Sequence, residues 1–95
     1  MNKSIRISVD RLNKRLGRPA TAWNKTMSAQ TANVGHLYAD HNTHYGGYRL
    51  EEMHNTGGGV CGFAHNSGTE ARMTCKVFKA YLKGIHDALD VMSYV

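Results

Sequence analysis

The spacing of apolar residues near the start of the chain is typical of a short helix. Four of them stand at i, i+4, i+7 and i+11 and so share one helical face: Ile5, Val9, Leu12 and Leu16. Gly17 and Pro19 follow directly, and such residues often end a helix. We therefore predict a helix over about residues 8–16, capped by Ser8. Because apolar residues also alternate over 4–9, as they do in a strand, that stretch stays open between helix and strand.

The next segment, residues 19–31, has no clean hydrophobic period. It is rich in Ala, Thr, Asn and Ser, which indicates a loop or an irregular edge strand. Trp23 lies within it, and aromatic rings contribute much of the buried area of small cores. We predict that Trp23 anchors the core rather than serving as a binding platform.

Three short segments in the middle of the chain have the pattern of strands. They are residues 32–40 (ANVGHLYAD), 47–54 (GYRLEEMH) and 60–65 (VCGFAH). The NTGGG stretch between the second and third supplies the positive φ angles that tight hairpins need. We predict a hairpin turn there, in preference to an anion-binding nest formed by Gly57–Gly59. Short strands joined by short turns predict an antiparallel meander.

A sustained apolar stripe marks the C-terminal part of the chain as a long helix. Its members recur at intervals of three and four residues: Phe78, Tyr81, Leu82, Ile85, Leu89 and Met92. Thr69 is a suitable cap and Glu70 suits a first turn, so we predict a helix over about residues 69–92. The order of elements then predicts one α+β domain over residues 1–95. In it, a three-stranded antiparallel meander packs against the C-terminal helix, with the short N-terminal helix at its side (α-β-β-β-α).

Composition is that of a folded domain. The chain has 95 residues, 41% of them hydrophobic, and one proline. No apolar run is long enough to span a membrane, and charges occupy the start, so we predict a cytoplasmic protein without a membrane partner. Cys61 and Cys75 are then expected to be free thiols, with Cys75 packed on or near a helix. We expect a monomer or a small homo-oligomer.

Charge and aromatic residues indicate two candidate binding surfaces. The net charge of +5 and the pI near 9.5 favour acidic partners, either nucleic acid or an acidic protein surface. The basic residues of the predicted C-terminal helix stand at i, i+4, i+7 and i+11: Arg72, Lys76, Lys79 and Lys83. They form either a binding stripe or only a solvated helix face. Three tyrosines near the first hairpin are predicted to be anchors for a protein partner: Tyr38, Tyr45 and Tyr48.

The histidine-rich middle of the chain raises the question of a metal site. The candidate zinc ligands are His41, His44, His54, Cys61 and His65. Zinc signatures usually contain two tight ligand pairs, and this set lacks a second tight pair. We therefore predict that the histidines are exposed in turns, and that the protein holds no metal and no other cofactor. Cys61 is the single candidate nucleophile. Because no nucleophile, base and stabilising group stand together, we predict that the protein is not an enzyme.

Four short motifs carry a resemblance to a known class. Together with the C-terminal helix, they resemble small uncharacterised proteins encoded by bacteriophages and prophages. The motifs are RLNKRLGRP, NVGHLY, YGGYRLEEM and NTGGGV. The resemblance covers about Asp10–Phe63 and implies a phage accessory protein, a class that includes anti-defence inhibitors such as anti-CRISPR proteins. The α-β-β-β-α order is also similar, more weakly, to double-stranded RNA-binding domains. That family begins its last helix with a basic cluster, whereas here no compact lysine pair stands at the helix start.

These observations predict a non-catalytic protein that binds a host protein or a ribonucleoprotein complex and inhibits a host or defence system. One alternative is a nucleic-acid-binding domain that uses the basic face of the C-terminal helix. Another is a small zinc-binding protein that uses the histidine-rich hairpin.

Overall fold

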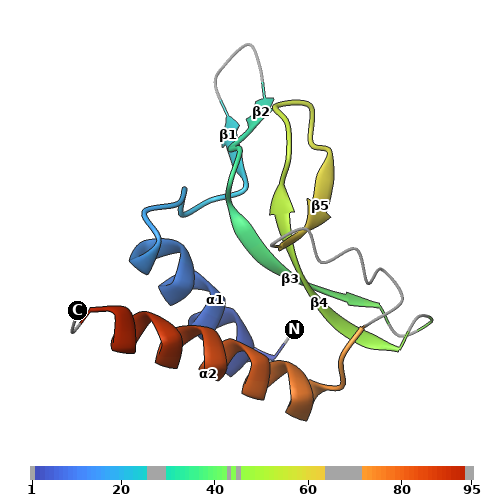
Figure 1. Ribbon diagram of the computed structural model, residues 1–95. Coiled ribbons are helices and arrows are strands. Elements are labelled where there is room, and N and C mark those ends of the chain that lie inside the picture. Colours follow the sequence, from blue (N-terminus) through green and yellow to red (C-terminus); the bar gives the residue numbers. More distant parts are fainter. Residues whose placement is uncertain (1, 26–29, 43, 45, 64–71, 94–95) are drawn as a thin grey trace.

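The computed structural model describes residues 2–25, 30–42, 44, 46–63 and 72–93. Its elements are α1 (Lys3–Arg15), β1 (Trp23–Lys25), β2 (Gln30–Ala32), β3 (Leu37–Asn42), β4 (Gly47–Met53), β5 (Val60–Gly62) and α2 (Cys75–Met92) (Figure 1). Strands β3, β4 and β5 form an antiparallel sheet in that order, and β1 and β2 pair separately. The predicted α+β class and the three-stranded meander are confirmed. The β1–β2 pair was expected only as a loop or an irregular edge strand.

Helix α1 begins earlier than its apolar period indicated. The side chain of Asn2 caps it, because Oδ1 accepts hydrogen bonds from the main-chain N–H groups of Ser4 and Ile5. The predicted start at Ser8 is therefore wrong, and the strand alternative for residues 4–9 is wrong as well. At the other end, Gly17 has φ of 67° and the helix ends at Arg15, close to the predicted boundary.

Helix α2 begins later than predicted. Thr74 caps it by accepting a hydrogen bond from Val77 N–H, whereas the expected cap, Thr69, lies outside the described residues. Met73 cannot belong to the helix because its N–H and C=O pair with those of Tyr48, at 2.8 and 2.7 Å. The sheet thus holds the chain extended up to the cap. The predicted end at Met92 is confirmed.

The two helices lie side by side and run in the same direction (Figure 1). Near their N-termini, Asn2 Nδ2 lies 3.7 Å from Cys75 Sγ, and near their C-termini Arg15 Nη2 lies 2.6 Å from Asp90 Oδ1. Between these contacts the buried imidazole of His86 donates from Nε2 to the carbonyl of Ser8 and accepts at Nδ1 from Arg15. Because a guanidinium only donates and a main-chain carbonyl only accepts, these partners select the tautomer that carries its proton on Nε2.

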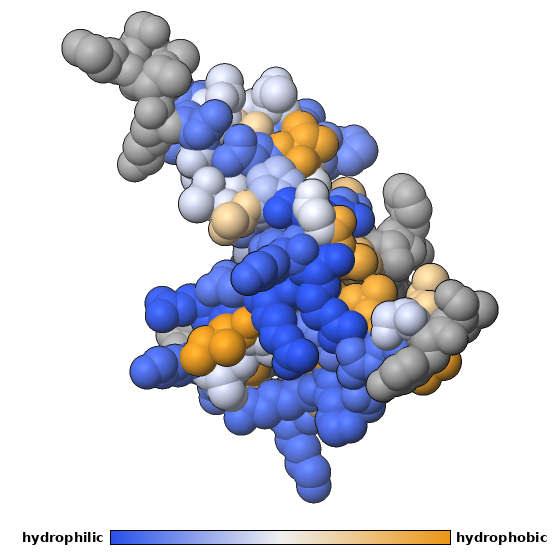
Figure 2. Space-filling view, turned by 90° about the vertical axis from the view of Figure 1, so that its left-hand side faces the viewer, coloured by the Kyte–Doolittle hydropathy of each residue, from blue (hydrophilic) through white to orange (hydrophobic). Residues whose placement is uncertain are grey.

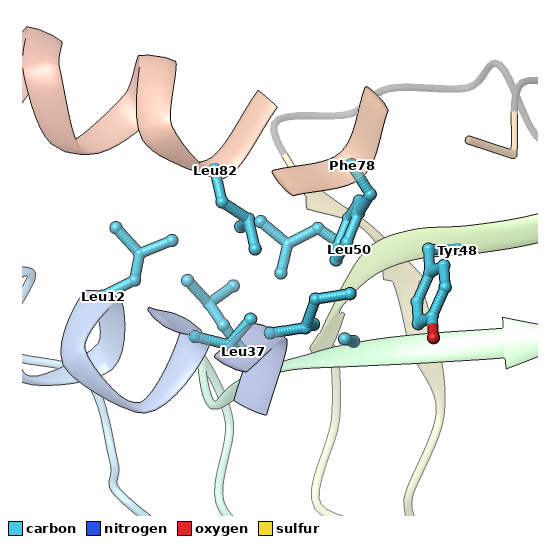
Figure 3. Packing of buried hydrophobic residues seen from close by; sticks show 9 residues of the cluster. Leu12, Leu37, Tyr48, Leu50, Phe78 and Leu82 are labelled. Atoms are coloured by element: carbon cyan, nitrogen blue, oxygen red, sulfur yellow. The ribbon is translucent and has the colours of Figure 1, made fainter. Parts of the chain in front are cut away.

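The core lies between the helices and one face of the three-stranded sheet. Its best-buried members are Ile5, Val9, Leu12, Leu37, Ala39, Leu50, Phe78 and Leu82. Figure 3 shows Phe78 and Leu82 of α2 pointing toward Leu37 and Leu50 of the sheet. The prediction that α2 lies across the sheet is thereby confirmed, and Cys75 packs partly buried against this cluster at the start of the helix, as expected.

Trp23 does not belong to this core. It is 37% exposed, and its ring lies over Gly58 in the β4–β5 turn. The main-chain N–H of Ala32 donates to Thr56 in the same turn. The prediction of a core anchor is therefore wrong, because the ring holds the β1–β2 pair against a hairpin turn away from the helices.

Among the described residues, no helix has both the length and the apolar character needed to cross a membrane.

Candidate functional site

The predicted tyrosine surface does not form as expected. Tyr48 is 8% exposed, and its ring stacks between His41 and Phe78 with centroid distances of 4.3 and 5.4 Å. The expectation that Tyr48 is presented at the surface is therefore wrong, whereas its role as a partner anchor stays a prediction. It is buried because strand alternation turns it to the core side of β4. Tyr45 lies outside the described residues.

Tyr38 is half-buried on the opposite face of the sheet. Its hydroxyl donates to Oε2 of the buried Glu51 at 2.7 Å. Burial raises the pKa of Tyr38 well above its ordinary value, and the hydrogen bond to the Glu51 carboxylate raises it further. The phenol therefore stays protonated at physiological pH and contributes as a hydrogen-bond donor rather than as a proton carrier.

The predicted basic stripe loses its first member. Arg72 precedes α2, and positions four apart share a face only within a helix. Its side chain is 10% exposed, and Nη2 lies 2.6 Å from Asp40 Oδ2. Nη1 donates to the main-chain carbonyls of Asp40 and Gly47. Arg72 is thus a clamp that holds the chain before α2 against the β3–β4 hairpin, and the four-residue stripe is wrong.

The other basic residues lie on an exposed surface of mixed charge. Lys76 and Lys79 are exposed, and Lys83 pairs with Asp87 at 2.7 Å, which raises the pKa of Lys83. A depression of about 410 Å³ between α1 and α2 has lysine and arginine as well as aspartate in its lining: Arg11, Lys79, Lys83, Asp87 and Asp90. Figure 2 shows one face of the molecule as mostly hydrophilic, with apolar residues in separate patches. The mixed charge does not have the single sign that tracks a phosphate backbone.

The candidate zinc ligands are divided between two places on the sheet. His41 pairs with Tyr48, whereas Cys61 pairs with Glu52, four residues further along β4 and about 13 Å away at the usual rise per residue. His54 Nδ1 is 3.8 Å from Cys61 Sγ. His44 is in the β3–β4 turn, and His65 lies outside the described residues. Within the described ranges, no group of three or more His, Cys, Asp or Glu residues is placed to hold a metal ion.

The surroundings of the Cys61 thiol raise its pKa. It lies 3.8 Å from Glu52 Oε1, toward which it donates. Desolvation raises the pKa of Cys61, and the neighbouring Glu52 carboxylate raises it further. Nucleophilic cysteines require the opposite shift, which a positive neighbour supplies. The arrangement therefore disfavours the thiolate.

The glycine stretch is a turn, as predicted. The side-chain oxygen of Asn55 accepts hydrogen bonds from the main-chain N–H groups of Gly57 and Gly59, and the main-chain carbonyl of Asn55 accepts from the N–H of Gly58. All three N–H groups of this stretch are thus satisfied from within the turn. The alternative of an anion-binding nest is wrong, because no N–H group is left to face an anion.

A trough beside β3 was not foreseen from the sequence. Its volume is about 510 Å³, and it is lined by Arg6, Val9 and Asp10 of α1, by residues 20–22, and by residues 36–39. Its apolar members are small or medium-sized side chains, and its polar members are Arg6, Asp10, Thr21, His36 and Tyr38. Pockets that bind ligands have this size, and their linings likewise combine apolar side chains with polar groups.

No family model, no curated protein and no solved structure matches the chain. The resemblance to phage accessory proteins stays a prediction, and so does the weaker similarity to double-stranded RNA-binding domains. The chemistry of the trough must therefore be inferred from its own geometry.

The trough lies along an outer edge of the three-stranded sheet, because β3 is an edge strand in the order β3-β4-β5. Helix α1 is next to this strand (Figure 1). One sequence signal pointed to this place. Asn13 is a polar residue beside Leu12 on the apolar face of α1, and it is 1% exposed. A buried amide requires hydrogen-bond partners, and it finds both on Leu37 of β3.

Proposed function

We propose that the protein acts without catalysis, by binding a host protein or a ribonucleoprotein complex, and that it inhibits a host or defence system as a phage-type accessory protein. The observation that supports this most is the trough between α1 and the edge of β3. The apolar part of its lining, which includes Val9 and Leu37, suits the burial of a partner's side chain. Buried anchor residues of this kind supply most of the binding free energy at protein interfaces.

The charge of the chain supports the same proposal. The net charge of +5 favours approach of an acidic partner and accelerates association. Arg6 stands at the trough itself, where its guanidinium can meet a carboxylate. A protein surface with acidic residues around an apolar contact would satisfy both features.

The test is capture of partners from a bacterial lysate, with and without nuclease treatment, by the wild-type chain and by two matched variants. Ala20→Trp fills the trough, whereas Ala88→Trp adds the same side chain to an exposed position of α2. We expect a protein partner that survives nuclease and is lost only with Ala20→Trp. A partner that disappears with nuclease, or no partner at all, would contradict the proposal.

A second candidate function is nucleic-acid binding, favoured by the exposed lysines of α2, Lys76 and Lys79. Arg72 cannot contribute in this structure because its guanidinium is already bound by Asp40 and main-chain carbonyls. Each duplex phosphate contact should add about 0.9 to the slope of log affinity against log salt. Tight binding of random duplex DNA or RNA at physiological salt, abolished when Lys76, Lys79 and Lys83 become glutamine, would place this function first.

A further inference from the structure

The outer edge of β3 offers unpaired main-chain groups. The N–H and C=O of Leu37 point away from β4, since both are bonded to Asn13. Because successive residues of a strand point alternately to its two neighbours, Ala39 and His41 also point outward. In the described part of the chain, no hydrogen bond reaches the main chain of Ala39 or His41 from that side. Both residues thus keep an unpaired N–H and an unpaired C=O. Those of His41 are at an exposed position, whereas Ala39 is only 5% exposed and can be reached only from the trough that it lines.

Asn13 fixes where this open edge begins. Its amide occupies the position that a neighbouring strand would take at Leu37, so an added strand can pair only from Ala39 onward. The open part is short, since Ala39 and His41 are about 7 Å apart along the strand. A short edge bordered by a helix resists uncontrolled sheet extension, yet it still accepts one extended segment.

The trough supplies a place for the side chain of such a segment. In an added strand, alternate side chains point to the same face of the sheet, and here one such face is bordered by α1. Val9 and Leu37 give the trough apolar walls, and the small side chains of Ala20 and Ala39 leave it room. In strand addition, main-chain hydrogen bonds give affinity and pockets for alternate side chains give specificity.

From this geometry we propose that the edge of β3 and the trough bind an extended peptide segment of an acidic partner protein as an added antiparallel or parallel β-strand. The proposal rests on the proposed function and names the mode of binding. The segment carries an apolar side chain that enters the trough and an Asp or Glu residue that meets Arg6.

A second copy of the chain is a poorer occupant for this edge. Pairing of β3 with β3 would bring the two α1 helices close together, each with the same exposed basic residues: Lys3, Arg6, Arg11 and Lys14. Asp10 is the acidic exception on this helix. Like charges placed opposite each other oppose association, whereas an acidic peptide is attracted by the same residues.

The test uses a displayed library of random eight-residue linear peptides, selected against the wild-type chain. His41→Pro removes the outward N–H without removing a hydrogen bond to β4, and proline is tolerated at strand edges. His41→Ala is the matched control, because it removes the same exposed side chain, including its stacking on Tyr48, and keeps the N–H. Thermal unfolding of both variants shows whether each is folded.

We expect selected peptides to carry an apolar and an acidic residue two positions apart, so that both face the trough. They should bind His41→Ala nearly as well as wild type and lose about tenfold or more in affinity with His41→Pro. A second readout needs no variant: amide hydrogen exchange of Ala39 and His41 in the wild-type chain should slow when the peptide binds. Equal binding to both variants, or unchanged exchange at Ala39 and His41, would overturn strand addition.

Two further outcomes are also decisive. If sedimentation shows a wild-type dimer that His41→Pro converts to monomer, the edge is a self-association surface and the peptide proposal is wrong. A lysate partner that Ala20→Trp loses but His41→Pro retains would leave the proposed function intact and refute strand addition. Selected peptides that pass both readouts, with no protein captured from lysate, would support the edge site and contradict the proposed function.

Discussion

The side-chain amide of Asn13 hydrogen-bonds both main-chain polar groups of Leu37. Nδ2 donates to the Leu37 carbonyl at 2.9 Å, and Leu37 N–H donates to Oδ1 at 2.8 Å. A side-chain amide presents the same donor and acceptor as a peptide group, so Asn13 stands in for one residue of a missing strand. This explains why a polar residue lies on the buried face of α1.

Replacing Asn13 should therefore destabilise the fold even when volume is conserved. Asn13→Leu leaves the buried N–H and C=O of Leu37 without partners, and each unsatisfied group costs about 1–3 kcal/mol. We expect a loss of about 2–5 kcal/mol in the free energy of unfolding, measured by urea denaturation. Asn33→Leu is the control, because the Asn33 amide bonds to Thr21 at an exposed position and its loss should cost under about 1 kcal/mol. Equal losses in the free energy of unfolding for the two variants would show that the buried hydrogen bonds of Asn13 contribute no more than exposed ones.

Much of the fold could be predicted from hydrophobic period alone. The apolar stripe of α2 identified Phe78 and Leu82, which the structure places at the centre of the core. Glycine-rich turns identified the β3–β4–β5 meander. Helix starts were missed because several Ser, Thr and Asn residues are suitable caps, and the tertiary structure selects among them. Asn2 prevails over Ser8, and Thr74 follows from the pairing of Met73 with the sheet.

The candidate site was harder to predict, for a related reason. In a strand, a shift of one residue turns a side chain such as Tyr48 to the other face. For Arg72, the later start of α2 places the residue outside the helix, where helical spacing no longer applies. The trough brings α1 together with residues 20–22 and β3, three segments that no local period connects. Asn13 was the local sign of it, a polar residue next to Leu12 on an apolar face.

Core truncation on α2 should show how much of the stability comes from the helix–sheet contact. Phe78 is fully buried and Leu82 nearly so, and changing either to alanine should cost about 2–5 kcal/mol. Val77→Ala on the same helix removes a side chain that is half-exposed and should cost under about 1 kcal/mol. Thermal or urea unfolding of the three variants gives the comparison. Unchanged unfolding of Phe78→Ala would remove the packing argument.

Two adjacent glycines allow backbone strain to be separated from a steric clash. Gly46 and Gly47 both have positive φ, 89° and 126°, so alanine is strained at either position by about 1–2 kcal/mol. A Cβ at Gly46 meets no atom within 4 Å, whereas one at Gly47 would collide with the main-chain carbonyl of Met73. Gly47→Ala should therefore also break the pairing of Tyr48 with Met73 and cost about 1–3 kcal/mol more than Gly46→Ala. Equal costs in urea unfolding would mean that the pairing survives.

The clamp at Arg72 predicts a stability effect rather than a direct binding effect. Arg72→Met removes the ion pair with Asp40 and the hydrogen bonds to two carbonyls, and should cost about 1–3 kcal/mol, discounted because Asp40 is partly exposed. Lys76→Met changes the same charge on the exposed face of α2 and should leave unfolding nearly unchanged. If Arg72→Met unfolds like wild type but lowers affinity for duplex DNA or RNA, then Arg72 acts in nucleic-acid binding and the clamp is unimportant.

The pKa of Cys61 gives a prediction about its reactivity. Desolvation and the nearby Glu52 carboxylate raise this pKa, so at a given pH the thiolate fraction is smaller than in a free cysteine peptide, and alkylation by iodoacetamide should be slower. Glu52→Gln removes the Glu52 charge, whereas desolvation and the Glu51 charge remain. The pKa of Cys61 should therefore fall, and the curve of rate against pH should move to lower pH while staying above that of the peptide. Asp87→Asn, far along α2, is the charge-matched control and should leave the Cys61 rate unchanged. Because Cys75 is a second free thiol, the rate is measured in a Cys75→Ala background. The prediction is contradicted if Cys61 is alkylated as fast as the free peptide and Glu52→Gln does not change the rate. The Glu52 carboxylate would then not control the thiol, and the question of a reactive cysteine on β5 would be open again.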